Sequence, residues 1–85
     1  MDARTALADV RGFAAANQIL IGRHARERMV ERGVLYEDVR SALVSARSCR
    51  AQDGGRWRVS GSDRDGDDLD LIVVLEAGVV VVTVF

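Results

Sequence analysis

The sequence has 85 residues, of which 48% are hydrophobic and none is proline, and its formal net charge is −1. A chain of this length is too short for two independent hydrophobic cores, so we expect a single domain over residues 1–85. It has no apolar run of about 18 residues, no signal-peptide pattern at its N-terminus and only one cysteine. These features exclude a membrane span and an internal disulfide, and they predict a cytoplasmic protein.

Helical periodicity predicts two to three helices in the first part of the chain. Asp2 can cap a helix whose apolar residues lie three and four positions apart, within an N-terminal segment of residues 1–18. The following stretch, ILIG, is either an extended link or a small strand. Residues 23–32 and 36–47 are then expected as helices, with Gly33 ending the first of them. Residues 19–47 therefore form the second segment of the domain.

The period changes to two from Ser48 onward, which predicts a sheet in residues 48–85. Four strands are expected, within residues 48–52, 56–61, 69–76 and 79–85, because these runs are rich in valine and isoleucine. Helices followed by consecutive strands indicate an α+β fold. We expect the N-terminal helices to pack on one face of a four-stranded antiparallel sheet.

A two-residue turn at Ala77 and Gly78 would fix the register of the last hairpin. It pairs Glu76 with Val79 and Ile72 with Thr83, and it places these apolar residues under the helices: Leu69, Leu71, Val73, Leu75, Val80, Val82 and Val84. The opposite face is then half apolar. Such a face indicates a surface that a partner or a second subunit covers.

The stretch RHARERMVERG, residues 23–33, gathers cations around the only histidine of the chain. On a helix, His24, Arg28 and Arg32 lie at about 0°, 40° and 80° around the axis and form one stripe beside the inward-facing Ala25 and Met29. All 12 basic residues are arginines, whose planar guanidinium suits phosphate. The alternative is a solvated helix whose arginines pair with Glu27 and Glu31.

The segment HARERMVERGVLYEDVRSAL resembles the signature H-A-x-x-R-M-x-x-R-G of a small bacterial family of domains of unknown function. The resemblance covers residues 19–85 and includes the valine-rich final strand with its threonine. That family is similar in expected fold to the RelE and barnase-like ribonuclease superfamily, which includes toxins of toxin–antitoxin pairs. This chain departs from the family at Leu35, where serine or threonine would cap the third helix.

The resemblance implies a catalytic set of four residues, His24, Arg28, Arg32 and Thr83. A histidine moves protons near neutral pH, and arginines stabilise the charge that grows on a phosphate during cleavage. Thr83 would orient the substrate, although the sequence alone favours the interpretation that it is an ordinary β-branched strand residue. Further contacts to RNA are expected from Arg23, Tyr36, Arg56 and Arg58. The reaction is metal-independent cleavage through the ribose 2′-hydroxyl, so no metal and no cofactor are expected.

Two functions follow from these observations. The first is an endoribonuclease toxin that acts on RNA and is held inactive by a cognate antitoxin protein. The second is a non-enzymatic interaction or regulatory domain, either a monomer or a homodimer, whose arginine stripe binds an acidic partner. The aspartates of residues 63–68 do not make a calcium loop, because the glycine and glutamate that an EF-hand requires are missing at positions 68 and 74.

Overall fold

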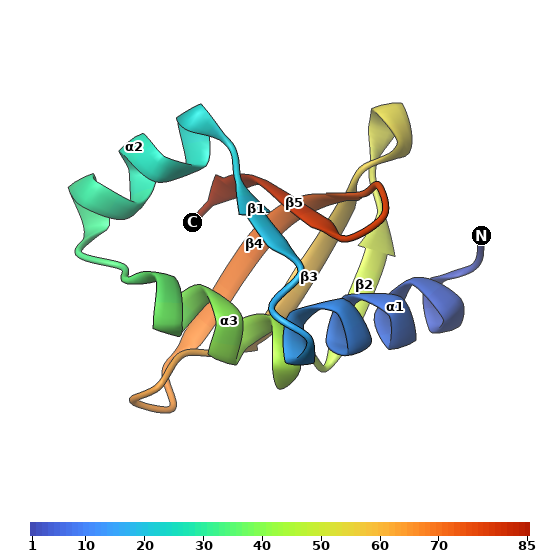
Figure 1. Cartoon of the computed structure of the whole chain (residues 1–85), viewed down its shortest axis with the longest axis horizontal. Coiled ribbons are helices and arrows are strands. Elements are labelled where there is room, and N and C mark those ends of the chain that lie inside the picture. Colours follow the sequence, from blue (N-terminus) through green and yellow to red (C-terminus); the bar gives the residue numbers. More distant parts are fainter.

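The computed structural model describes all 85 residues, and it has the expected α+β class. The chain forms α1 (Ala3–Ala15), β1 (Ile19–Ile21), α2 (Arg23–Arg32), α3 (Tyr36–Val44), β2 (Ser48–Ala51), β3 (Trp57–Ser62), β4 (Asp68–Leu75) and β5 (Val79–Val84), with a short 3-10 turn at Asp53–Gly55 (Figure 1). Three helices therefore precede the run of strands β2–β5. No helix combines the length and the apolar character that a bilayer crossing requires.

The sheet has five strands in the order β1-β5-β4-β3-β2, so the expected four-stranded antiparallel sheet is wrong in strand number and in direction. Strands β2 to β5 do form an antiparallel meander, but β1 pairs with β5 in parallel. The pairing is fixed at both ends of β1, where Val79 N–H donates to the Gln18 carbonyl and Gly22 N–H donates to the Val81 carbonyl, both at 2.9 Å. Three residues are too few for their strand periodicity to be recognised in the sequence.

The register of the last hairpin differs from the expected one over half of its length. Leu75 pairs with Val79, so the turn holds three residues instead of two, and the pairs next to it are shifted by one residue. A bulge then leaves Val82 without a partner and restores the expected pair of Ile72 with Thr83. As a result Val79 and Val81, rather than Val80 and Val82, are buried under the helices, whereas Val84 is buried as expected.

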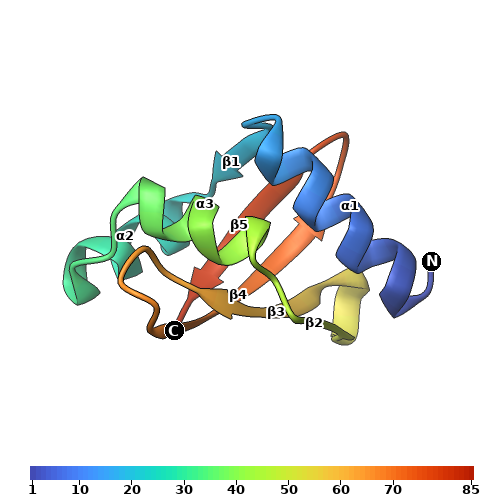
Figure 2. The same ribbon diagram turned by 90° about the horizontal axis from the view of Figure 1, so that it is seen from below.

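Helices α1 and α3 cover one face of the sheet, here called the inner face, and Figure 2 shows both on the same side of the strands. The largest fully buried side chains lie between these layers: Val10, Val39, Leu43, Val59, Leu71, Val73, Val79, Val81 and Val84. Gly61 of β3 lies under the backbone of α3 and permits a close approach there. The opposite face of the sheet, the outer face, is covered by neither α1 nor α3.

The boundaries of α2 are as expected, whereas α3 is shorter than expected. Gly33 ends α2 in the left-handed conformation with φ 67°, and the Val34 N–H donates to the Met29 carbonyl, which closes the last turn. Helix α3 ends at Val44 because the chain then turns toward the sheet. There the Arg47 N–H donates to the Ser60 carbonyl at 2.8 Å.

Helix α3 begins without a side-chain cap, since its N-cap residue is Leu35. The carboxylate of Asp38 accepts a hydrogen bond from the Leu35 N–H at 3.1 Å and one from the Arg64 guanidinium at 3.2 Å. The hydrogen bond from Leu35, followed by those from Arg64, holds the pKa of Asp38 below its ordinary value. The acidic residue in the first turn thus stabilises the start of the helix in place of the missing hydroxyl.

We expect Asp38→Ala to lower stability near neutral pH and to have a smaller effect in acid. Because the pKa of Asp38 is lowered in the folded state, its contribution is present above the unfolded value of 3.8 and is lost as the pH falls through the folded value. Urea unfolding of both proteins at pH 7 and pH 3 measures this difference. An unchanged difference in midpoint at the two pH values would show that the carboxylate charge does not contribute.

Candidate functional site

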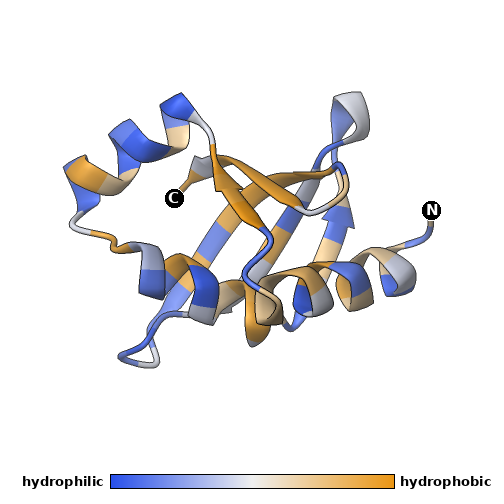
Figure 3. Ribbon diagram, viewed as in Figure 1, coloured by the Kyte–Doolittle hydropathy of each residue, from blue (hydrophilic) through white to orange (hydrophobic).

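Helix α2 lies against β5 through two small-to-medium side chains, Ala25 and Met29, which are buried as expected from their positions on the helix. The other residues of α2 are polar apart from Val30, and Figure 3 shows the helix as mostly hydrophilic. Strand β1 pairs with only the first half of β5. Helix α2 directly follows β1 in the chain and also contacts β5, where Arg28 reaches Val84 at its end. The cationic side of α2 is therefore placed beside the C-terminal end of β5.

Arg28 is the residue of the α2 stripe that touches the sheet. Its Nε donates to the Val84 carbonyl at 3.4 Å, and its Nη1 lies 3.5 Å from Oε2 of Glu31. Only 29% of its side chain is exposed. The hydrogen bond to the Val84 carbonyl places the guanidinium beside the C-terminal end of the β5 backbone.

His24 and Arg32 lie one turn before and one turn after Arg28, and both are exposed. Neither side chain forms a hydrogen bond or an ion pair within the protein. The distance between neighbouring side chains of such a series is about 5–6 Å at Cβ, which is close enough for one phosphodiester to reach two of them. The stripe thus presents one ordered guanidinium between two free cationic or titratable groups.

Both carboxylates of α2 pair with arginines, as the solvated-helix alternative expects. Glu31 contacts Arg28, and Glu27 contacts Arg23, again at 3.5 Å. Both glutamates are largely exposed, and exposed pairs at this distance contribute little, about 0.2–1 kcal/mol. A phosphate can displace such pairs at low cost.

The remaining candidate residues lie on the outer face and on α3. Arg58 ion-pairs with Asp70 at 2.9 Å, and its guanidinium lies 4.4 Å from the ring centre of Phe85. The strand register places Arg58 and Thr83 on either side of Ile72 in one row across the sheet. Arg56 is exposed directly before β3. Tyr36 is exposed at the start of α3, which carries neither the stripe nor the row of Arg58, Ile72 and Thr83.

The hairpin register expected from the sequence put Asp70 and Phe85 on the outer face, but sequence reasoning missed their contacts with Arg58, and it did not single out Arg50. Asp70 and Phe85 hold Arg58 from two sides, and Arg50 lies directly opposite Arg58 on β2. The signal that could have found them is the pairing register of β2, β3 and β4. The sequence motifs fixed a register only for the last hairpin, so the partners of Arg58 were not visible.

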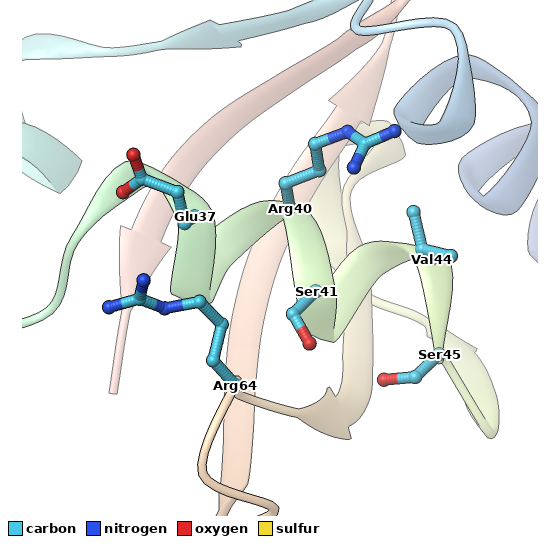
Figure 4. Close-up of a pocket in the computed structure, with 6 residues that line it drawn as sticks. All are labelled: Glu37, Arg40, Ser41, Val44, Ser45 and Arg64. Carbon is cyan, nitrogen blue, oxygen red and sulfur yellow. The ribbon is translucent and has the colours of Figure 1, made fainter.

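The largest hollow of the surface lies elsewhere, on the solvent side of α3, and has a volume of about 450 Å³. Figure 4 shows its lining residues, among them Arg40 and Arg64, with side chains that point away from one another. Arg64 is bound to Asp38, and Arg40 donates to the carbonyls of Ala14 and Ala15 at the end of α1. Both cations serve the packing of α3, and the hollow has no convergent polar groups.

Cys49 is the only thiol, and it is buried on the inner face of β2. Burial raises the pKa of this thiol to about 11, so the reactive thiolate is scarce at neutral pH. The side chain acts as a small apolar residue of the core.

The comparison with known protein families gives one match. Residues 21–85 match the model of a family described as "Domain of unknown function (DUF4258)". No curated protein and no solved structure matches the chain. The matched residues include the whole of α2 and all of the strands from β2 to β5, whereas α1 lies outside them.

Proposed function

We propose that residues 21–85, by which this chain belongs to the DUF4258 family, form a metal-independent endoribonuclease of the RelE and barnase-like type. The protein would act on RNA as the toxin of a toxin–antitoxin pair in the bacterial cytoplasm. One observation carries the proposal: Arg28 is ordered against the end of β5, while His24 and Arg32 on either side of it are exposed and unpaired. An arrangement of this kind can hold a phosphate next to a proton-transfer group.

The chemistry follows from these three side chains. A base removes the proton of a ribose 2′-hydroxyl, the oxygen attacks the adjacent phosphorus, and the bond from phosphorus to the 5′-oxygen breaks as an acid protonates that oxygen. His24 is assigned to one of the two proton transfers. Arg28 and Arg32 stabilise the charge on the non-bridging oxygens. Thr83, which precedes Val84 in β5, orients the sugar, and Arg23, Tyr36, Arg56 and Arg58 provide further contacts to RNA.

A non-enzymatic interaction domain is the second candidate. It is favoured by the uncovered apolar side chains of the outer face. In this case the stripe binds the carboxylates of a partner, and His24 has no chemical role.

A matched pair of substitutions in α2 separates the two candidates. Arg32 belongs to the stripe, whereas Arg26 lies about 120° away around the same helix, and both are exposed and unpaired. With single-stranded RNA in the presence of EDTA, we expect Arg32→Ala to lower the cleavage rate by about 10²-fold, as the loss of one charge-stabilising donor does. Arg26→Ala should cleave at the wild-type rate. A wild-type protein that leaves RNA intact would contradict the proposed function.

A further inference from the structure

The outer face of the sheet brings like charges together on neighbouring strands. Arg50 of β2 and Arg58 of β3 are direct cross-strand partners, an arrangement that repels unless a counter-charge is present. Asp70 neutralises Arg58, but Arg50 has no ion-pair partner. Arg56, two residues before Arg58 and therefore on the same side of the chain, has none either. This corner of the outer face, defined by Arg50, Arg56 and Arg58, has three guanidinium groups and one carboxylate.

An aliphatic band adjoins this corner on the same face. Ile72 is the cross-strand neighbour of Arg58, Val74 pairs with Val80, and Val80 pairs with Leu20 at the free edge of the sheet. Leu20 is 65% exposed, and the other three are partly exposed. At the Leu20 end of the band lies a hollow of about 320 Å³, lined by residues 17–20 and 76–80.

We infer that the outer face docks a protein partner, a polypeptide segment that carries both carboxylate and aliphatic side chains. Carboxylates would neutralise Arg50 and Arg56 through paired hydrogen bonds, and aliphatic side chains would cover the band from Ile72 to Leu20 and fill the hollow beside it. RNA fits the whole face less well, because aliphatic side chains offer bases no ring on which to stack. The chain itself is also not strongly basic.

This inference rests on the proposed function, in which a cognate antitoxin holds the enzyme inactive, and it specifies where that partner binds and what its segment contains. A partner segment bound at Arg50 and Arg58 would cover the start of the cross-strand row formed by Arg58, Ile72 and Thr83. It would therefore compete with RNA for Arg58 and Thr83, which accounts for inhibition by occupancy without any change of conformation.

The test uses a fluorescent synthetic peptide of alternating glutamate and valine as the probe and a peptide of alternating lysine and valine as its control. Anisotropy titrations are run with the wild type, Arg50→Glu, Leu20→Ser and Arg4→Glu. Arg4 is an exposed, unpaired residue of α1, and its replacement changes the net charge by the same amount as Arg50→Glu. Circular dichroism confirms that each variant is folded.

We expect the acidic peptide alone to bind, with an affinity about tenfold or more lower for Arg50→Glu, lower for Leu20→Ser and unchanged for Arg4→Glu. The inference is wrong if both peptides bind alike, if Arg4→Glu weakens binding as much as Arg50→Glu, or if neither peptide binds and Arg50→Glu instead weakens binding of single-stranded RNA. RNA cleavage measured in parallel keeps the two proposals apart. Peptide binding without any cleavage refutes the proposed enzyme, whereas cleavage that the acidic peptide does not inhibit refutes this docking surface.

Discussion

His24→Ala is expected to lower the rate of RNA cleavage by about 10²–10⁴-fold, the range found when a general acid or base is removed. The side chain is exposed and makes no hydrogen bond or ion pair in the protein, so its loss should change the stability by no more than about 0.5 kcal/mol. The measurement is the cleavage rate of a labelled single-stranded RNA, together with a urea unfolding curve of each protein.

Exposure of His24 also permits a rescue experiment. Free imidazole can reach the space that the missing side chain leaves, so added imidazole should restore part of the activity of His24→Ala. It should not restore the activity of Arg32→Ala, in which the proton-transfer group is intact. If His24→Ala cleaves RNA at the wild-type rate, the histidine has no role in proton transfer and the assignment of the stripe as an active site is wrong.

Gly61→Ala should cause the largest loss of stability among the glycine-to-alanine changes of this chain, because a Cβ there has the shortest contact. A Cβ at this position would overlap the carbonyl oxygen of Ala42 and lie 2.7 Å from its carbonyl carbon. Both atoms belong to the backbone of α3, so the helix would have to move away from β3. Overpacking of this kind costs about 3 kcal/mol or more, which is a large part of the stability of a small domain.

The matched control for this prediction is Gly12→Ala. Gly12 lies inside α1 with open space around it, and alanine is the better helix former there by about 0.5–1 kcal/mol. The same chemical change should therefore stabilise the protein at position 12 and destabilise it at position 61. Thermal unfolding followed by circular dichroism measures both, and each kcal/mol corresponds to about 4–8 °C at this size. Equal melting temperatures for Gly61→Ala and the wild type would show that α3 does not pack as closely as the structure indicates.

The elements with a long periodic pattern could be predicted from the sequence. The spacing of apolar residues in α2 predicted which side of the helix is buried, and Gly33 marked its end. The same reasoning left β1 open between a link and a small strand, because its three residues carry no periodicity, and it did not predict the pairing with residues sixty positions away in β5. Local patterns do not encode which distant strand will be the neighbour.

The candidate site was predictable to a similar degree. The i, i+4 spacing placed His24, Arg28 and Arg32 in one stripe, because a helix fixes the direction of each side chain. The contact of Arg28 with Val84 and the enclosure of Arg58 by Asp70 and Phe85 depend on tertiary packing. The last hairpin shows the same limit, since the three-residue turn shifts the register and reverses which valines face the helices until the bulge at Val82 restores it.

The most direct test of the central claim uses two oligonucleotides of one sequence, one with ribose and one with 2′-deoxyribose throughout, incubated with the wild-type protein in EDTA. Attack by the 2′-oxygen predicts that only the ribose form is cut, with a 2′,3′-cyclic phosphate on one product and a 5′-hydroxyl on the other. Cleavage of both forms, or products that carry a 5′-phosphate, would contradict the mechanism that we assign to the α2 stripe.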